Sequence, residues 1–480
     1  MWPFVGKKSA PVYFTDTLSG KKEEFKPLTP GKALLYSCGP TVYGAIHIGN
    51  LRSFVLADLV GRTLKAAGYK VERVMNITDV GHMVGDGDEG DDKLAVGAAR
   101  EKTTPEAVAD KYTALFMEDI RALGIDTADF KKFPRATSYI KEDIAMIKAL
   151  EKKGYTYKTS EGLYFDTAKF KDYGTLHGMK DAALRAGARV DMGEKKSPHD
   201  FVLWRAAKAN DLQKWNSPWG SGNPGWSIEC SAMATALLGT QIDIHTGGED
   251  LASVHHNNEI AQSEGASGKH PYVKYWVHGA FLTMAGEKLA KSAGNSFTLA
   301  DVVAKGHHPL ALRYLFLQAH YRSPLSFSWD ALAAADKTLK RLWKEAAAIK
   351  AQAEGRSKKT KAIEIINDAI FDDLATPQVI AQLWAVINDA HLPAPEKWAV
   401  LIAIEKALGL SLTVPPIDTG GAMHSLTLAD LSDEVQRLAA EREVARNNKD
   451  FAMSDELRET LKGLGYAVED AEDGPRFTKI

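Results

Sequence analysis

The clearest pattern of apolar positions begins with a short continuous run that is typical of a buried strand over residues 33–38. Apolar side chains then recur at spacings of three and four, at Leu51, Phe54, Val55 and Leu59. This spacing predicts a helix over residues 50–67 that opens at Asn50, a good N-cap residue, and ends at Gly68. A second apolar run predicts a strand over 71–78. The three elements form a β–α–β unit, which indicates a parallel sheet.

The remaining pattern predicts several further regions. They are, in order, an edge hairpin over 11–31, helices over 93–123 and 137–153, a helix from 226 to 238, a strand over 241–244, a helical bundle over 329–410 and a linker over 411–424. Helical periodicity fades over 155–221, where short β-like pieces stand at 162–165 and 201–204. We therefore expect a domain inserted between two halves of the first one. A final module over 425–480 is predicted to be mostly helical with a short β-like tail.

Composition narrows the class of protein. At 480 residues the chain is too long for one core, and 45% hydrophobic and 25% charged residues are typical of a globular protein. A formal charge of −2 means that a nucleic acid would have to be held by local patches. Neither a secretory signal nor a membrane span is expected. The two cysteines, Cys38 and Cys230, suggest a cytosolic protein in which disulfides are rare, so both are candidate ligands.

The loop between the first strand and the first helix has the features of a phosphate site. Free backbone N–H groups and the positive end of the helix dipole favour an anion there. His47 and Asn50 add side-chain donors, and Cys38 stands at the carboxyl end of the strand, where open parallel sheets bind ligands. A single histidine near a helix start is more often a packing residue, so this loop alone does not establish a function.

A second candidate site combines distant residues. His255 and Glu259 are four apart, so on a helix they project from one face. Together with Cys38 and Cys230 they would make a zinc set of two thiolates, one imidazole and one carboxylate. The metalloprotease pattern does not fit, because it needs two histidines at that spacing with a glutamate between them. The acidic run over 85–92 lacks the spacing of a calcium loop and is interpreted as a solvated loop.

Several stretches carry a family resemblance. His47-Ile-Gly-Asn50 and Lys288-Leu-Ala-Lys-Ser292 resemble the HIGH and KMSKS sequences of class I aminoacyl-tRNA synthetases. Other stretches are similar to the cysteinyl-tRNA synthetases within that class. They are Tyr36-Ser-Cys-Gly-Pro-Thr-Val-Tyr43, Gly225-Trp-Ser-Ile-Glu-Cys-Ser-Ala-Met233, Ile242-Asp-Ile-His245, the segment from His255 to Ser263, His320-Tyr-Arg-Ser323 and the tail from Ala445 to Phe451. The similarity covers nearly the whole chain.

The resemblance implies an α/β fold in which a Rossmann-type catalytic domain is split by a connective insertion. A helical bundle and a small C-terminal anticodon-binding domain would follow. The expected divisions are 1–125 and 222–328 for the two catalytic halves, 126–221 for the insertion, 329–415 for the bundle and 425–480 for the anticodon-binding domain.

The resemblance also assigns residues. One zinc ion would be held by Cys38, Cys230, His255 and Glu259. The amino-acid pocket would include Trp226, His245 and Thr41. ATP, with magnesium, would bind His47, Gly49, Asn50, Lys288 and Lys291. Asn50 replaces the last histidine of HIGH, and Leu289 and Ala290 replace the first methionine and serine of KMSKS.

The implied reaction is activation of L-cysteine with ATP and transfer of the cysteinyl group to the terminal ribose of its tRNA. A zinc ion would separate cysteine from serine, because it prefers a thiolate to a hydroxyl. Arg442, Arg446 and Lys449 lie at i, i+4 and i+7 and could form a basic stripe for tRNA, although an exposed mixed-charge helix fits this pattern equally well. We expect a monomer in the cytoplasm.

Two rival functions share these motifs. A ligase that joins cysteine to an amino sugar would use the same zinc and ATP residues, but it lacks the region after about residue 425. A catalytically inactive, RNA-binding relative would be expected to lose His47 or the two lysines, and this chain retains all three.

Overall fold

The computed structural model describes residues 11–81, 93–176, 193–209, 211–284, 287–288, 296–358, 360–416, 431, 433–448, 450–464, 466–471 and 474–479. The chain forms two compact units. The first consists of residues 1–299 and 309–415, and the second of residues 300–308 and 416–480.

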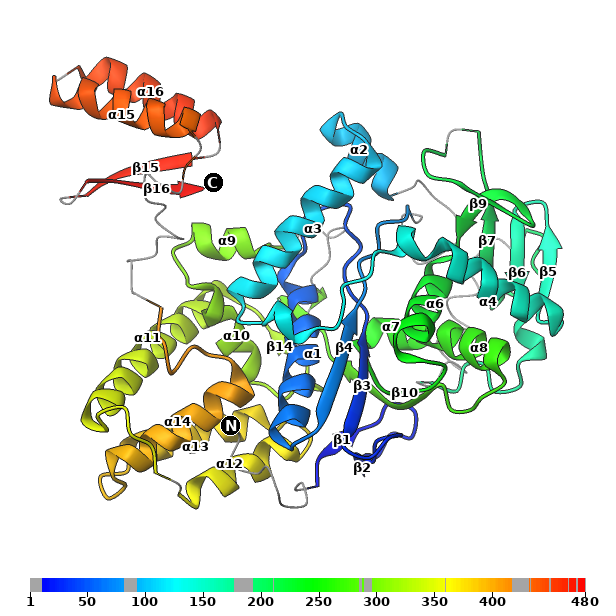
Figure 1. Cartoon of the computed structure of the whole chain (residues 1–480), viewed down its shortest axis with the longest axis horizontal. Coiled ribbons are helices and arrows are strands. Elements are labelled where there is room, and N and C mark those ends of the chain that lie inside the picture. The colour runs from blue at the N-terminus through cyan, green and yellow to red at the C-terminus, as the bar shows by residue number, and fades with distance from the viewer. Residues whose placement is uncertain are drawn as a thin grey trace. The chain divides into compact units, whose positions relative to one another are not determined.

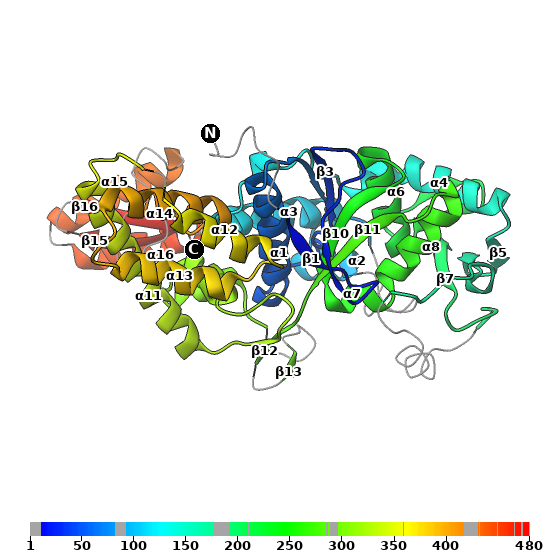
Figure 2. The same ribbon diagram turned by 90° about the horizontal axis from the view of Figure 1, so that it is seen from below.

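A parallel sheet forms the centre of the first unit, with the strand order β11–β10–β3–β4. Figure 1 labels β10, β3 and β4 of this sheet, and Figure 2 labels β11. Its strands are β3 (Lys32–Ser37), β4 (Lys70–Met75), β10 (Ile242–Gly248) and β11 (Val273–Gly279). Each neighbouring pair runs parallel. β10 is buried along nearly its whole length, as expected for a strand covered on both faces. The predicted parallel sheet is confirmed.

Helices cover both faces of this sheet. α1 (Ile48–Ala66) packs on one face, and α6 (Trp226–Leu238) packs on the other (Figure 1). α4 (Ile140–Lys152) and α8 (His255–Ser267) pack against α6. The carboxyl ends of β3 and β10 are therefore flanked by helices on two sides.

The chain leaves the parallel sheet after β4 and returns to it at β10. Between them lies an antiparallel sheet with the order β5–β6–β7–β9–β8. These strands are β5 (Thr156–Thr159), β6 (Gly162–Phe165), β7 (Phe201–Ala206), β8 (Trp215–Ser217) and β9 (Gly220–Pro224). The β-like pieces expected at 162–165 and 201–204 are confirmed.

The helical stretch expected over 93–123 consists of two helices. The structure has α2 (Lys93–Glu101) and α3 (Pro105–Ala122), separated by a short turn. The Thr104 side chain accepts a hydrogen bond from the Ala107 N–H at 3.2 Å and caps the second helix. Proline at the first position of α3 lacks the N–H that a continuing helix needs. A single apolar pattern therefore runs across two separate helices.

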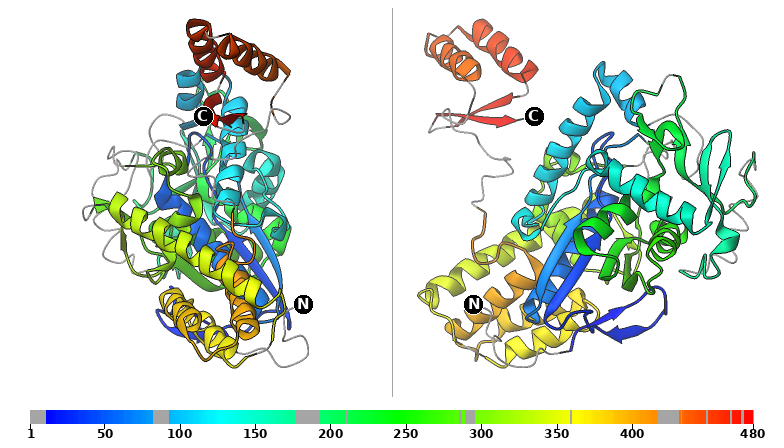
Figure 3. Two further views of the ribbon diagram at one scale, coloured as in Figure 1. Left: turned by 90° about the vertical axis from the view of Figure 1, so that its left-hand side faces the viewer. Right: turned by 45° about the vertical axis from the view of Figure 1, so that its right-hand side comes forward.

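The C-terminal half of the first unit is helical. α11 (Trp329–Gln352), α12 (Ala362–Phe371), α13 (Thr376–Asn388) and α14 (Ala394–Leu408) pack together, and α14 also packs on α1 (Figures 2 and 3). The remaining elements of this unit are β1 (Tyr13–Thr15), β2 (Lys22–Glu24), α7 (Glu249–Ser253), β12 (Leu282–Met284), β13 (Glu287–Lys288), α10 (Pro309–Leu317), β14 (Leu325–Ser326) and the 3-10 turns Thr127–Asp129, Ala136–Tyr139 and Thr167–Lys169. β1 and β2 form the predicted hairpin.

The second unit includes most of α9 (Leu299–Ala304) and a C-terminal module with its own core. The module consists of α15 (Asp433–Asn447), α16 (Phe451–Gly463) and an antiparallel pair, β15 (Tyr466–Ala471) and β16 (Gly474–Lys479). Its core contains Leu431, Val435, Leu438, Ala439, Leu461, Val468 and Phe477. Across the described part of the chain, no helix is both long enough and apolar enough to span a membrane.

Candidate functional site

Cys38 lies at the carboxyl end of β3, as the sequence predicts. Its backbone N–H donates to the Thr246 carbonyl of β10 at 3.2 Å. The next residue, Gly39, donates its N–H to the Asn76 side chain at 2.9 Å. A Cβ at position 39 would lie 1.7 Å from the Asn76 carbonyl oxygen, so only glycine lets the two backbones approach this closely. This approach fixes the loop that begins at Cys38.

Two helices supply the other predicted ligands. α6 carries Cys230, and α8 begins at His255 and carries Glu259 one turn later. The Nε2 atom of His255 lies 3.2 Å from Oε1 of Glu259, which agrees with the four-residue spacing. Cys230, His255 and Glu259 are all buried.

The structure brings these side chains together with one more histidine. Donor atoms of Cys38, His255, His256 and Glu259 all lie within 4.8 Å of one another. The Cys230 thiol is not one of these four, but Cys38 and His255 are near enough to it to lower its pKa. We call these five residues the sulfur–histidine cluster. All four predicted ligands belong to it, and both thiols are free of disulfide bonds.

Sequence reasoning missed His256. Its Nε2 atom lies 3.4 Å from the Cys38 sulfur and 3.9 Å from Oε1 of Glu259. The available signal was its spacing of three from Glu259, which is also compatible with one helix face. Whether His255 or His256 faces a metal cannot be read from spacing alone, because both positions neighbour the carboxylate.

Charge within the cluster is unevenly distributed. A hydrogen bond with Cys38, helped by His255, lowers the pKa of Cys230 to about 6 against the opposing effect of burial. Burial raises the pKa of the Cys38 thiol well above its usual value. Although burial opposes ionisation of Glu259, His245 and His255 lower its pKa to about 2. Negative charge therefore collects on Cys230 and Glu259. Although burial opposes protonation of His255, this charge raises the pKa of His255 to about 10, so a proton stands where a cation could bind.

A surrounding ring of polar contacts orients the cluster. The Nε2 atom of His245 lies 3.2 Å from Oε2 of Glu259. The Ser227 hydroxyl lies 3.0 Å from Nδ1 of His255, and Nε2 of His278 lies 2.7 Å from Nδ1 of His256. Engaging the second nitrogen of each imidazole fixes the ring orientation and leaves Nε2 directed toward the centre.

The three residues predicted to form the amino-acid pocket differ in how they contact this cluster. The Trp226 ring is half-buried, and its centroid lies 4.3 Å from that of His255. His245 is fully buried and contacts the cluster through Glu259. Thr41 is half-buried in the loop after Cys38, where its backbone pairs with that of Thr78.

The first ATP motif lies at the start of α1, but Asn50 is not the N-cap, so that prediction is wrong. The helix begins at Ile48 with His47 as its N-cap. The Ile48 N–H donates to the Phe297 carbonyl at 2.7 Å, and His47 forms a bridge with Thr298. This contact with a distant segment holds the chain extended up to His47. Asn50, two residues into the helix, is exposed, and Gly49 is half-exposed.

The second ATP motif is partly described. Lys288 lies in β13, where it pairs with Thr283 of β12. Lys291 lies outside the described residues. Phe297 and Thr298, which follow this motif in the sequence, contact Ile48 and His47 at the amino end of α1.

The predicted basic stripe is only partly described, and Arg442 does not contribute to an exposed surface. Arg442 is only 1% exposed, because it follows the core residues Leu438 and Ala439 by four and three positions and shares their face of α15. Arg446 is half-buried, and Lys449 lies outside the described residues. The expectation of an exposed Arg442 is therefore wrong.

Two family models match the chain. Residues 24–337 match the tRNA synthetases class I (C) catalytic domain, and residues 428–476 match the cysteinyl-tRNA ligase anticodon binding domain.

Curated relatives match over nearly their full length. A cysteine–tRNA ligase of Treponema denticola is 41% identical, covering 97% of this chain and 99% of the relative. Cysteine–tRNA ligase 1 of Burkholderia lata is 41% identical with 97% of each covered, and the enzyme of Thermus thermophilus is 38% identical with 96% and 98% covered.

Solved structures share the fold. Methionyl-tRNA synthetase of Mycobacterium tuberculosis bound by methionyl-adenylate has a TM-score of 0.55 at 13% identity, covering 80% of this chain and 93% of that chain. LeuRS of Agrobacterium radiobacter K84, in a ternary complex with tRNA, has a TM-score of 0.59 at 11% identity, covering 83% and 87%. The matches to both domains and to full-length relatives favour tRNA ligases over the amino-sugar ligase. The chain belongs to the cysteine–tRNA ligase family of class I aminoacyl-tRNA synthetases.

Proposed function

We propose that this chain activates L-cysteine with ATP to cysteinyl-adenylate and transfers the cysteinyl group to the 3′-terminal ribose of the tRNA for cysteine. The observation that carries the proposal is the convergence of one thiol, two imidazoles and a carboxylate at the carboxyl end of β3, with the Cys230 thiol near enough to interact electrostatically with them. The tRNA half is supported by the match of residues 428–476 to an anticodon binding domain.

The cluster suits zinc by the chemistry of its donors. Zinc is commonly bound by thiolate, imidazole and carboxylate, and the thiolate character of Cys230 and the ionised Glu259 would neutralise its charge. We propose Cys38, Cys230, His255 and Glu259 as the ligands, with His256 as the alternative imidazole. When bound, zinc would supply a borderline-soft Lewis acid that prefers a cysteine thiolate to a serine hydroxyl.

The residues around the cluster have proposed roles that need no further metal chemistry. Ser227 orients the His255 ring through Nδ1 of His255, and His278 orients the His256 ring through Nδ1 of His256. His245 holds Glu259 in its ionised form. The half-buried Trp226 ring beside His255 would form an apolar wall for the amino acid and limit the access of water, and Thr41 would lie at the entrance of the same pocket.

Activation is attack by the cysteine carboxylate on the α-phosphate, with pyrophosphate leaving. Both reactants already carry the reacting groups, so the protein needs to position them and to stabilise charge. We propose that His47, Gly49 and Asn50 bind the phosphates at the amino end of α1, with Lys288 and Lys291 on the pyrophosphate side and magnesium carried by ATP. Asn50 can donate to a phosphate oxygen but, unlike histidine, cannot carry charge. We further propose a monomer acting in the cytoplasm.

The test combines metal analysis with cysteine-dependent ATP–pyrophosphate exchange and tRNA charging. We expect about one zinc per chain, exchange that depends on cysteine, and charging that depends on the tRNA. Cysteine-dependent exchange without any tRNA charging would contradict the proposal and favour a ligase that uses another acceptor. The absence of zinc from purified protein would contradict the metal assignment.

Lys291→Ala tests the proposed role of Lys291 in the reaction with ATP. Removing a cation that stabilises the transition state should slow adenylate formation by roughly 100- to 1,000-fold while leaving the zinc content unchanged. Lys269→Ala, at an exposed position, is the matched control and should retain the parent rate. A normal exchange rate in the Lys291 variant would contradict this assignment.

A further inference from the structure

One guanidinium group joins three segments of the first unit. Arg52, which is 6% exposed, donates through Nη1 to the carbonyl oxygens of Ala280 and Phe281, both at 2.8 Å. Through Nη2 it donates to the carbonyl oxygens of Ser323 at 2.7 Å and His320 at 3.3 Å. A side chain of α1 thus hydrogen-bonds to four main-chain acceptors that are remote from it in sequence.

These acceptors lie at the base of the hairpin that carries the second ATP motif. β12 begins directly after Phe281, and β14, which pairs with β12 in parallel, begins two residues after Ser323. The Phe281 N–H donates to the Glu249 carboxylate, and the Ala280 N–H donates to the Tyr321 carbonyl, both at 2.8 Å. The base of the hairpin is therefore held by its own backbone, by Glu249 and by Arg52.

The segment on the other side of Arg52 is itself fixed. His320 Nε2 lies 2.7 Å from the Asp373 carbonyl oxygen, and the Tyr321 hydroxyl donates to the Asp373 carboxylate at 2.6 Å. The same carboxylate accepts hydrogen bonds from the N–H and the hydroxyl of Thr15. Residues 320–323 therefore provide a rigid platform, and Arg52 fixes the hairpin base and the start of α1 against it.

The chemistry of the contact requires arginine. A planar guanidinium presents five donors in a fixed fork, whereas a lysine ammonium is a compact point charge with three rotatable donors. Four carbonyl oxygens arranged around one side chain match the fork. Burial lowers the pKa of Arg52 to about 10, with Glu249 opposing the shift, so the side chain is charged at neutral pH.

Arg52 follows Asn50 by two residues and His47 by five on the same helix. We propose that Arg52 is a positioning residue for ATP, which sets the separation and orientation of the amino end of α1 relative to the hairpin that carries Lys288. This inference rests on the proposed function, because it assumes that the two segments bind one ATP molecule. Arg52 itself would not touch ATP. In the described part of the chain it has no hydrogen bond or ion pair with the sulfur–histidine cluster, so the cysteine side of the reaction should be independent of it.

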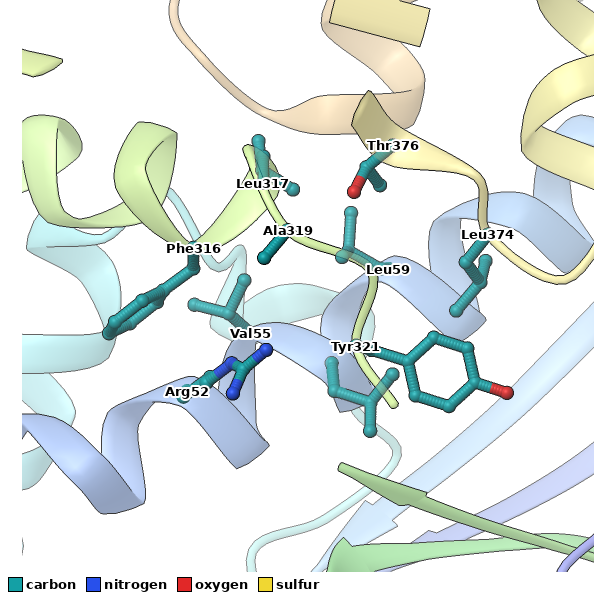
Figure 4. Close-up of a pocket in the computed structure, with 10 residues that line it drawn as sticks. Arg52, Val55, Leu59, Phe316, Leu317, Ala319, Tyr321, Leu374 and Thr376 are labelled. Atoms are coloured by element: carbon teal, nitrogen blue, oxygen red, sulfur yellow. The ribbon is translucent and has the colours of Figure 1, made fainter. Parts of the chain in front are cut away.

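A small cavity lies beside this guanidinium (Figure 4). Its volume of about 20 Å³ is roughly the room that one water molecule needs. Val55, Leu59, Phe316 and Leu374 supply much of its apolar lining. Removing the Arg52 side chain would enlarge this space, because a packed core collapses only partly around a deletion. A free guanidinium ion could then occupy the vacated volume and reach the same carbonyl oxygens.

The test uses the zinc-containing full chain and measures steady-state pyrophosphate exchange while ATP and cysteine are varied separately. For Arg52→Ala we expect kcat/KM for ATP to fall roughly 100-fold, as for a misplacement of reacting groups by about 1 Å, while KM for cysteine stays within about twofold. Added guanidinium at roughly 20 mM, far below denaturing concentrations, should restore part of kcat/KM for ATP. Sodium chloride at the same concentration should not restore it.

Arg62→Lys on the same helix is the matched control. Arg62 donates to Asp58 and to the Gly124 carbonyl, not to the hairpin base. Its variant should therefore lose stability without changing the ratio of KM for ATP to KM for cysteine. If Arg52→Ala does not fold, Arg52→Lys should also lower kcat/KM for ATP and leave KM for cysteine nearly unchanged, because an ammonium cannot span four acceptors.

The positioning role is overturned if the folded Arg52 variant keeps the parent kcat/KM for ATP, or if its KM for cysteine rises in proportion to its KM for ATP. Failure of the proposed function would look different, because the parent chain would then show no cysteine-dependent exchange at all.

Discussion

Cys230 is the single residue on which the proposed amino-acid selectivity depends most. Its thiol is buried, and Cys38 and His255 lower its pKa although burial opposes the shift. A thiolate that is already stabilised binds a soft or borderline metal at a smaller cost than an ordinary thiol. A hydroxyl at this position would have neither the softness nor the acidity.

We therefore predict that Cys230→Ser lowers zinc content and reduces the preference for cysteine over serine by more than about 100-fold, with a smaller effect on KM for ATP. Metal analysis and exchange kinetics with each amino acid measure this. Met233→Leu, a volume-conserving change at a buried position of the same helix, is the control. If binding of ATP weakened as much as binding of cysteine, the result would contradict the assignment of Cys230 as a zinc ligand.

At the scale of elements, α1 is held by a buried charge cluster centred on Asp58, near the middle of the helix. The Asp58 carboxylate lies 2.6 Å from Arg62 Nε, 2.7 Å from Arg313 Nη2 and 3.3 Å from Arg73 Nη1. The Arg313 Nε–H donates to the Leu408 carbonyl at the carboxyl end of α14. One carboxylate thus connects α1, β4 and α10 and neutralises charge that would otherwise be buried alone.

The pH dependence of stability follows from this cluster. Burial alone would raise the pKa of Asp58, but attraction by Arg62, Arg313 and Arg73 outweighs it and holds this pKa well below its usual range. A lowered folded-state pKa means that the stabilisation is fully present above the unfolded-state pKa of about 3.9. It is lost as the pH falls through the folded-state pKa.

We predict that Asp58→Asn lowers the free energy of unfolding at neutral pH by roughly 3–5 kcal/mol, because buried guanidinium groups lose their counter-charge. The parent should lose stability below about pH 4, and the variant should show a shallower dependence there. Urea unfolding at a series of pH values measures both. Asp368→Asn, at an exposed position of α12, should change neither, and an unchanged acid slope for the Asp58 variant would contradict the argument.

At the scale of the whole molecule, the two family matches fall on different compact units. The catalytic-domain match lies almost wholly in the first unit, and the anticodon-binding match lies in the second, which has its own apolar core. A unit with its own core can in principle fold alone. Amino-acid activation and tRNA recognition should therefore be separable.

We predict that a chain ending at Pro415 keeps cysteine-dependent pyrophosphate exchange and loses tRNA charging. If the C-terminal module supplies roughly 2–3 kcal/mol of tRNA binding, kcat/KM for charging should fall about 30- to 150-fold. Parallel exchange and charging assays measure this, with a thermal melt to verify folding. Loss of both activities in a folded truncated chain would contradict the separation.

The sequence by itself determined the parallel sheet, the helical region, the C-terminal module and the family. It also identified the four proposed zinc ligands, because i and i+4 spacing on α8 and the scarcity of thiols are properties of the chain alone. Periodicity reports which face of an element is apolar, and residue type reports which donors are present. Both are local properties, so they can be predicted from the sequence where local structure dominates.

Only the tertiary structure decided what depends on contacts between remote segments. The start of α1 is set by Phe297, the entry of His256 into the cluster by Cys38 of another element, and the burial of Arg442 by the core of its module. The four partners of Arg52 are carbonyl oxygens, which every residue possesses, so no pattern of side chains could have marked them. Main-chain acceptors acquire a partner only when folding brings a particular donor to them.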